Sequence, residues 1–162
     1  MGIRSFQGER APVSRAFQAN ITVSDYMSKQ LITFTPDQTL ISVMEKLVKN
    51  KITGGPVINE NNELLGIISD SDCMKQISES RYFNMPIGST RIVSDYMSTE
   101  VETIQADTNV FDAASRFSKS PHRRFPVIEN GKLVGQISQQ DVLRAALKLS
   151  AEHWRDFSRV IA

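Results

Sequence analysis

The sequence predicts an α+β protein made of two β-α-β-β-α repeats that pack about a pseudo-two-fold axis. The first observation is a repeat, because Val23–Ser28 (VSDYMS) recurs letter for letter as Val93–Ser98. The second is that each copy is followed by the same order of β-rich and amphipathic helical segments. The third is size: a unit of about 60 residues buries too little apolar surface to be stable alone. Two copies are therefore expected to pack against each other.

The repeat extends through both halves of the chain. Pro56–Ile58 matches Pro126–Ile128 at an offset of 70, and 64–72 then matches 133–141 at an offset of 69. The lost residue falls in a stretch rich in turn-forming residues, and turns absorb changes of length. The resulting segments are an N-terminal arm (1–20), a first repeat (21–77), a linker (78–91), a second repeat (92–148) and a C-terminal helical extension (149–162).

Within the first repeat, the elements follow from composition and periodicity. The segment 31–35 is rich in β-formers and stops at Pro36, which predicts a strand. Apolar residues of 40–48 recur at helical spacing and predict a helix with one buried face. Two short strands joined by an Asn-rich turn follow, and a second helix begins near Asp70. The second repeat has the same order, so we expect small mixed sheets with helices on one face. Val23–Met27 predicts a short helix that starts at Ser24 and leads into its own unit.

Composition limits the class of protein. The chain has 162 residues, a net charge of +1, one Cys and two His. This charge makes a nucleic-acid partner unlikely, and the few Cys and His residues exclude a Cys/His zinc cluster. A single Cys fits a reducing compartment. Apolar runs are too short for a membrane helix, and the first ten residues lack the apolar core of a signal peptide. We therefore expect a cytoplasmic protein that requires no metal and has no membrane partner.

The tandem unit resembles a pair of CBS (cystathionine-β-synthase) domains, often called a Bateman module. Three motifs support this resemblance, each present in both repeats: Val23–Met27 with Val93–Met97, Gly54–Ile58 with 123–128, and 66–72 with 135–141. The resemblance covers about 21–148. It implies that an adenosine-containing ligand (AMP, ADP, ATP or S-adenosylmethionine) binds in a cleft between the two units. It also implies regulation of an attached or partner protein, and association of two modules into a homodimer.

A Ser-x-x-Asp motif occurs in both repeats, as Ser69 to Asp72 and as Ser138 to Asp141. The resemblance implies that the Asp binds ribose hydroxyls and the Ser a phosphate. An ionised carboxylate accepts from two hydroxyls, and a Ser at a helix start lies beside N–H groups that stabilise a phosphate. The same spacing is typical of a helix N-cap, and the two roles do not exclude each other.

Each repeat has a proline in its second predicted strand, Pro56 or Pro126. Basic residues precede it only in the second repeat, as His122, Arg123 and Arg124. The resemblance implies that such residues face the ligand phosphates, and Arg suits that task. Because adjacent strand residues point to opposite faces, one arginine is expected to reach the cleft directly, and Arg124 is preferred. The alternative is one solvated and one salt-bridged arginine. Gly55, in the first repeat, fits either close backbone approach to a base or a bulge.

Thr33 and Thr103 stand in register in the two first strands. The resemblance places such residues at the adenine pocket, and the alternative is an ordinary residue on a sheet face. The sequence has neither a Lys/Arg-rich triphosphate cradle nor a Gly-rich P-loop, which favours AMP or ADP over ATP. Ser138, Asp141 and Arg124 of the second repeat are expected to dominate binding.

Two further features remain open. Apolar residues from Leu143 to Ile161, including Trp154 and Phe157, recur at helical spacing. We expect these apolar side chains to be buried against the module itself, a dimer partner or an effector protein. Cys73 follows Asp72 at a helix start, where a lowered thiol pKa and a redox role are possible, but a small buried apolar residue is the preferred interpretation.

Together these observations predict a stand-alone regulatory module that senses an adenine nucleotide and signals to an effector protein. The repeats occupy most of the chain, and no Ser/His/Asp arrangement, metal-ligand spacing or carboxylate pair suggests an enzyme. The alternative is a purely structural dimerisation module with no bound nucleotide.

Overall fold

The computed structural model describes residues 21–87 and 90–161, without the side chains of six residues near the end of the last helix. The N-terminal arm 1–20 and the side chains of Trp154 and Phe157 therefore lie outside the described residues. The first unit contains α2 (Leu40–Asn50), β1 (Gly54–Ile58), β2 (Leu64–Ser69) and α3 (Asp70–Phe83). The second contains β3 (Ile104–Gln105), α4 (Val110–Lys119), β4 (Arg124–Glu129), β5 (Lys132–Ser138) and α5 (Gln139–Ile161). Two short helices, α1 (Val23–Tyr26) and η2 (Val93–Asp95), precede the two units.

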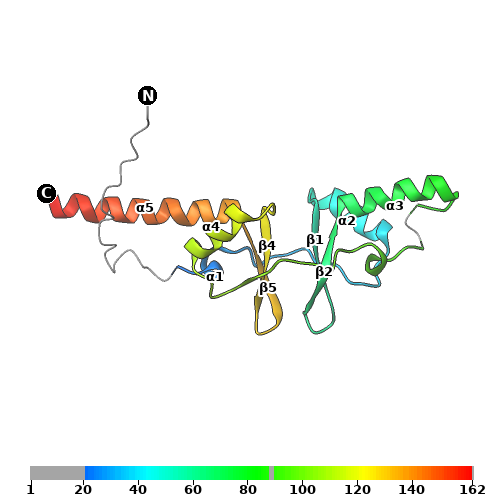
Figure 1. The fold of residues 1–162 in the computed structure, drawn as a ribbon, viewed down its shortest axis with the longest axis horizontal. Helices are drawn as coiled ribbons and strands as arrows, with labels where there is room; N and C mark the ends of the chain where they lie inside the picture. The colour runs from blue at the N-terminus through cyan, green and yellow to red at the C-terminus, as the bar shows by residue number, and fades with distance from the viewer. Residues whose placement is uncertain (1–20, 88–89, 162) are drawn as a thin grey trace, which may run out of the picture.

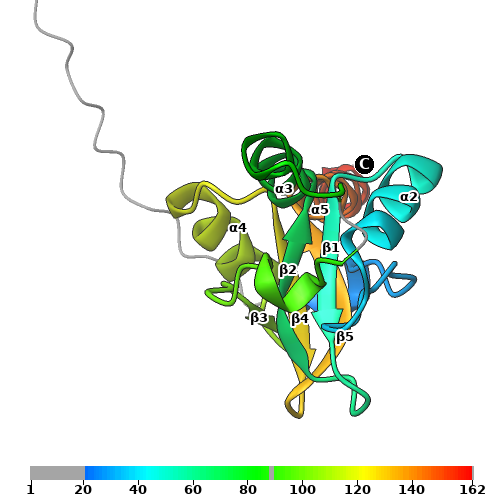
Figure 2. The same ribbon diagram turned by 90° about the vertical axis from the view of Figure 1, so that its right-hand side faces the viewer.

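The two sheets face each other at the centre of the molecule, and the helices lie on their outer sides (Figure 1). β1 and β2 form an antiparallel pair, whereas β3, β4 and β5 form a mixed sheet in which β3 is parallel to β4. Viewed along the long axis, the sheets lie one behind the other, and α3 and α5 share one side of the molecule (Figure 2). The predicted α+β class, with small sheets covered by helices on one face, is confirmed.

The predicted strand over 31–35 is wrong in extent. Only Phe34 pairs there, in a single parallel bridge to Val57. The reason lies at Gly55, where a Cβ atom would come 2.7 Å from the Ile32 carbonyl oxygen and 2.9 Å from the Phe34 ring. The backbone at Ile32 therefore crosses the face of β1 instead of running beside it, so no ladder forms there.

The short lead-in helices exchange units. Val23 of α1 is buried in the core of the second unit with Ile104 and Phe125. Val93 is buried in the core of the first unit, against residues such as Phe34. Each lead-in segment also forms a bridge to a strand of the other unit, Ser28 to Gln136 and Ser98 to Ile67. Each core is thus completed by the other repeat.

The start of α1 also differs from the prediction. Thr22, and not Ser24, is the N-cap, and it forms a capping box with Asp25. The Thr22 hydroxyl donates to the Asp25 carboxylate at 3.2 Å, and the Thr22 N–H donates to it at 2.9 Å. Ser24 instead contacts the Thr22 hydroxyl at 2.9 Å.

Candidate functional site

A cavity of about 580 Å³ lies between the two units, a volume in the range of small-molecule sites. The first unit contributes the segment after α1 and the start of β1. The second contributes the start of β4, the end of β5 and the first turns of α5. The lining residues are Ser28, Gln30, Leu31, Ile32, Ile52, Gly54, Gly55, Pro56, Arg123, Arg124, Gln136, Ser138, Gln139, Gln140, Asp141 and Leu143.

Ser138 and Asp141 both line this cavity, and they also cap α5. The Asp141 carboxylate accepts from the Ser138 N–H at 2.7 Å and from the Ser138 hydroxyl at 2.8 Å. The Asp141 N–H donates back to the Ser138 hydroxyl at 3.2 Å. Arg144 pairs with the other carboxylate oxygen of Asp141. Asp141 itself is only 7% exposed. Because each carboxylate oxygen has two lone pairs, Asp141 keeps room to accept from a ligand hydroxyl.

The first-repeat motif has the same local geometry in different surroundings. The Ser69 N–H and hydroxyl donate to the Asp72 carboxylate at 2.8 and 2.9 Å, and this capping box starts α3. Ser69 lines a smaller cavity of about 170 Å³ together with Gly54, Gly55 and Arg124. Asp72 is absent from the lining of both this cavity and the larger one.

Both arginines of the second repeat line the 580 Å³ cavity, where strand alternation predicted one. The reason is that β4 begins at Arg124, so alternation does not apply to Arg123. Both side chains are exposed, and neither guanidinium has a hydrogen bond or ion pair to the residues that the structure describes. Arg124 pairs across the ladder with Ser138, which brings this cation close to the start of α5. Two unpaired arginines and a helix N-terminus make this end of the cavity suitable for an anion.

The opposite wall of the cavity is apolar. Leu31, Ile32 and Ile52 line it from the first unit. Thr33 is not among the lining residues, and its carbonyl accepts from the Lys46 ammonium at 3.4 Å. The structure therefore brings Leu31 and Ile32, which precede Thr33, to the cavity in its place.

Two other predicted residues lie away from the cavity. The Thr103 carbonyl accepts from Arg116 at 2.7 Å, and Thr103 lines a separate cavity of about 290 Å³. The exposed His122 ring lies edge-on to Phe125, and its Nε2 is 3.9 Å from the Glu102 carboxylate. A hydrogen bond from Arg116, with smaller effects from Ser120 and the nearby positive charges, holds the pKa of Glu102 below its usual value.

Gly55 lines the cavity, and it also admits the close approach of a second backbone segment. The register shift of this hairpin lies between Val57 and Ile58, so Gly55 is not the bulge. Its missing side chain admits the Ile32 backbone, which places Ile32 at the wall of the cavity.

Gln136 is a lining residue that the sequence reasoning missed. It lies two residues before Ser138 on β5, and residues two apart on a strand share a face. This two-residue spacing is the sequence signal for Gln136, which lies just outside the Ser-x-x-Asp motif.

Cys73 is buried, with 1% of its surface exposed. Burial, followed by the negative charges of Asp72 and Asp70, raises the pKa of its thiol. This favours the apolar interpretation over a reactive thiol. Across 21–87 and 90–161, no three His, Cys, Asp or Glu side chains gather in a way that would hold a metal ion. In the same residues, no helix combines the length and apolar character needed to cross a bilayer.

Comparison with known proteins identifies the repeat. Residues 23–79 and 93–148 each match the model of the family described as CBS domain. The chain is 33% identical over 153 residues to the CBS domain-containing protein CBSX1, chloroplastic, of Arabidopsis thaliana, covering 79% of this chain and 65% of that protein. It is 31% identical over 156 residues to CBSX2, chloroplastic, of the same plant, covering 81% and 66%. The chain thus spans just under two thirds of the length of these relatives.

Solved structures show the same fold. The crystal structure of CBSX2 in complex with AMP matches with a TM-score of 0.68 and 32% identity, over 80% of this chain and 98% of that chain. The CBS domain pair of protein MJ0100, in complex with 5′-methylthioadenosine and S-adenosyl-L-methionine, matches with a TM-score of 0.59 and 25% identity, over 77% and 94%.

Proposed function

The chain belongs to the CBS domain family as a tandem pair, and from that premise we propose that it binds an adenosine-containing ligand and signals to an effector protein. AMP or ADP is the favoured ligand, and ATP and S-adenosylmethionine are the other candidates. In this proposal the ligand is regulatory, the chain is not an enzyme, and binding requires no metal.

The observation that carries the proposal is the chemical division of the 580 Å³ cavity. An apolar wall suits a purine base, and the end with Arg123 and Arg124 suits a phosphate. Asp141 lies at the same end and would accept from the ribose hydroxyls. A ligand with base, ribose and phosphate in that order matches both ends at once.

The relatives support the ligand class. CBSX2 has been solved with AMP, and the MJ0100 pair with two adenosine derivatives that lack a phosphate, 5′-methylthioadenosine and S-adenosyl-L-methionine. Two unpaired guanidinium groups favour a ligand with negative charge over the sulfonium cation of S-adenosylmethionine. AMP and ADP therefore fit this chain better than S-adenosylmethionine does.

The position of the cavity supports a signalling role. Both units line it, so a bound ligand would contact both. A ligand shifts an equilibrium between two arrangements only by its difference in affinity for them. A ligand that bridges the units favours the arrangement in which both walls touch it, and an effector would bind that arrangement.

We propose the cytoplasm as the location, and a lone buried thiol supports this proposal. The two Arabidopsis relatives are chloroplastic proteins.

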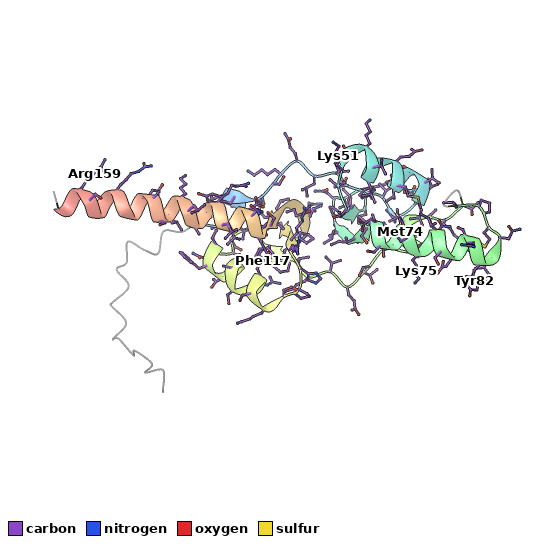
Figure 3. All side chains as sticks on the ribbon, turned by 90° about the horizontal axis from the view of Figure 1, so that it is seen from above. Lys51, Met74, Lys75, Tyr82, Phe117 and Arg159 are labelled. Atoms are coloured by element: carbon purple, nitrogen blue, oxygen red, sulfur yellow. The ribbon has the colours of Figure 1, made fainter. Side chains whose placement is uncertain are left out.

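We further propose a homodimer formed through α3 and α5. Met74 on α3 and Leu143 on α5 hold equivalent positions in the repeat and are 59% and 58% exposed. Leu147 on α5 and Tyr82 on α3 are also exposed, and Met74 and Tyr82 lie along α3 in Figure 3. Both helices lie on the same side of the molecule (Figure 2), so a second copy would cover one continuous apolar face. Sedimentation of the purified chain tests this, and a monomer at micromolar concentration would exclude it.

Thermal unfolding with AMP, ADP, ATP, S-adenosylmethionine and GTP tests the ligand proposal. A ligand at 100 times its Kd adds about 2.7 kcal/mol to the free energy of unfolding. For a chain of this length the midpoint is then expected to rise by about 5–10 °C. AMP or ADP should give this rise, and GTP should not.

A pair of double variants links the effect to the cavity. Arg123→Ala with Arg124→Ala should abolish most of the rise with AMP, because each charge-assisted hydrogen bond contributes about 1.5–3 kcal/mol. Lys49→Ala with Lys119→Ala removes the same charge from exposed positions outside the cavity and should keep the rise. Flat curves with all four adenosine ligands would leave the structural dimerisation module as the better account.

A further inference from the structure

The internal repeat predicts two equivalent clefts, but the structure builds them unequally. The large cavity lies at the start of α5, next to Ser138 and Asp141. Its counterpart would lie at the start of α3, next to Ser69 and Asp72. There the structure has the cavity of about 170 Å³, which is below the 300–1,000 Å³ typical of ligand pockets.

One difference between the repeats lies in the walls of both cavities. Gly54 and Arg124 hold equivalent positions, each first in its strand and each opposite the Ser of its motif. Gly54 has no side chain and contributes only backbone to the lining of the large cavity. On the other side, the Arg124 side chain lines the small cavity at the equivalent place and takes up space there.

Two further differences between the repeats concern the apolar wall. Ile32 and Ile52 line the large cavity. Their counterparts are Glu102 and His122, whose side chains approach to 3.9 Å. The second cleft therefore lacks the two isoleucines that form the apolar wall of the large cavity.

The second cleft also has fewer positive charges for a nucleotide than the large cavity has. In the first repeat, Thr53 stands at the position equivalent to Arg123, and Asp70 stands at the position equivalent to Gln139. The second cleft therefore has one lining arginine, Arg124, where the large cavity has both Arg123 and Arg124. A phosphate would therefore find fewer guanidinium donors there than in the large cavity.

We infer that each chain binds one anionic adenosine ligand, in the cleft next to Ser138 and Asp141, and that the cleft next to Ser69 and Asp72 stays empty. This inference rests on the proposed function. It adds how many ligands each chain binds and which of the two clefts holds the ligand.

Isothermal titration calorimetry with AMP tests it, because it reports affinity and stoichiometry together. The wild-type chain should bind one AMP per chain. Ser138→Ala should weaken binding by tenfold or more, and Arg123→Ala should do the same without touching a helix cap. Ser69→Ala is the matched control, since it removes the equivalent cap hydroxyl from α3 and should leave affinity and stoichiometry unchanged.

The outcomes separate the two levels of the proposal. Two AMP per chain, or a loss of affinity in Ser69→Ala with none in Ser138→Ala, would overturn the one-sided inference and leave the sensor function intact. No binding heat with AMP, ADP, ATP or S-adenosylmethionine would overturn the sensor function and the inference with it.

Discussion

The Tyr96 hydroxyl donates a hydrogen bond to the Glu79 carboxylate at 2.7 Å, whereas residues 21–87 and 90–161 offer no such acceptor to its counterpart Tyr26. The Tyr26 hydroxyl is buried without a hydrogen-bond partner among the described residues. The repeat itself explains this, because the position of Glu79 is taken by Lys148 in the second copy. Two identical lead-in segments are therefore anchored with different strength to the units that they complete.

Removing each hydroxyl should have opposite effects on stability. Tyr96→Phe is expected to lower the free energy of unfolding by about 1–2 kcal/mol, because it leaves Glu79 without its donor. Tyr26→Phe should leave stability unchanged or raise it slightly, because it removes an unsatisfied buried polar group. Urea unfolding of both variants measures this, and equal losses would contradict it.

The Tyr96 contact should also be sensitive to alkaline pH. The hydrogen bond to Glu79, with burial and the Glu79 charge, raises the pKa of Tyr96 above its ordinary value of 10.0. The folded chain then holds this proton to a higher pH than the unfolded chain does. The contribution is complete below the unfolded pKa and is lost as the pH rises through the folded pKa. The difference in stability between wild type and Tyr96→Phe should therefore be constant near pH 8 and shrink above pH 10.

Gly55→Ala should affect both stability and the cavity. The new methyl group would lie 2.7 Å from the Ile32 carbonyl, a backbone atom that cannot rotate away. We expect a loss of about 1–3 kcal/mol in the free energy of unfolding and weaker AMP binding, because Ile32 must shift.

Gly131→Ala provides the comparison for Gly55→Ala. Gly131 has φ +76° and open space around its Cα, so its substitution strains only an exposed turn. It should cost about 1 kcal/mol and leave AMP affinity unchanged. Equal AMP affinities in both glycine variants would contradict the role assigned to Gly55.

Cys73 should be unreactive in the folded protein. Its thiol is buried, and its pKa is raised above the ordinary value of 9.0, so little thiolate exists near neutral pH. A thiol reagent at pH 7.5 should label the native chain far more slowly than the same chain in urea. Rapid labelling without denaturant would restore the redox interpretation.

The order of elements could be predicted because each one leaves a local pattern. Helical periodicity at 40–48 and the Ser-x-x-Asp spacing predicted α2 and the starts of α3 and α5, and the structure agrees. The crossing of Ile32 over Gly55 could not be predicted, because it depends on two segments that are distant in sequence.

The exchange of lead-in helices was beyond the sequence for a different reason. Val23–Ser28 and Val93–Ser98 are identical, so neither copy indicates which core it fills. The choice depends on the length and path of the chain between the units. The asymmetry of the clefts, by contrast, was visible in part, since Glu102 stands where Ile32 does and Arg124 where Gly54 does.

The exchange of lead-in helices means that neither repeat is a separable module. A chain cut in its linker would give two polypeptides, each missing one valine of its own core and carrying the valine that the other lacks. Each fragment alone is expected to remain largely unfolded, while an equimolar mixture should reassemble. The tandem pair is therefore expected to unfold as a single cooperative unit despite its duplicated sequence, and its linker offers a cut site for a split-protein reporter.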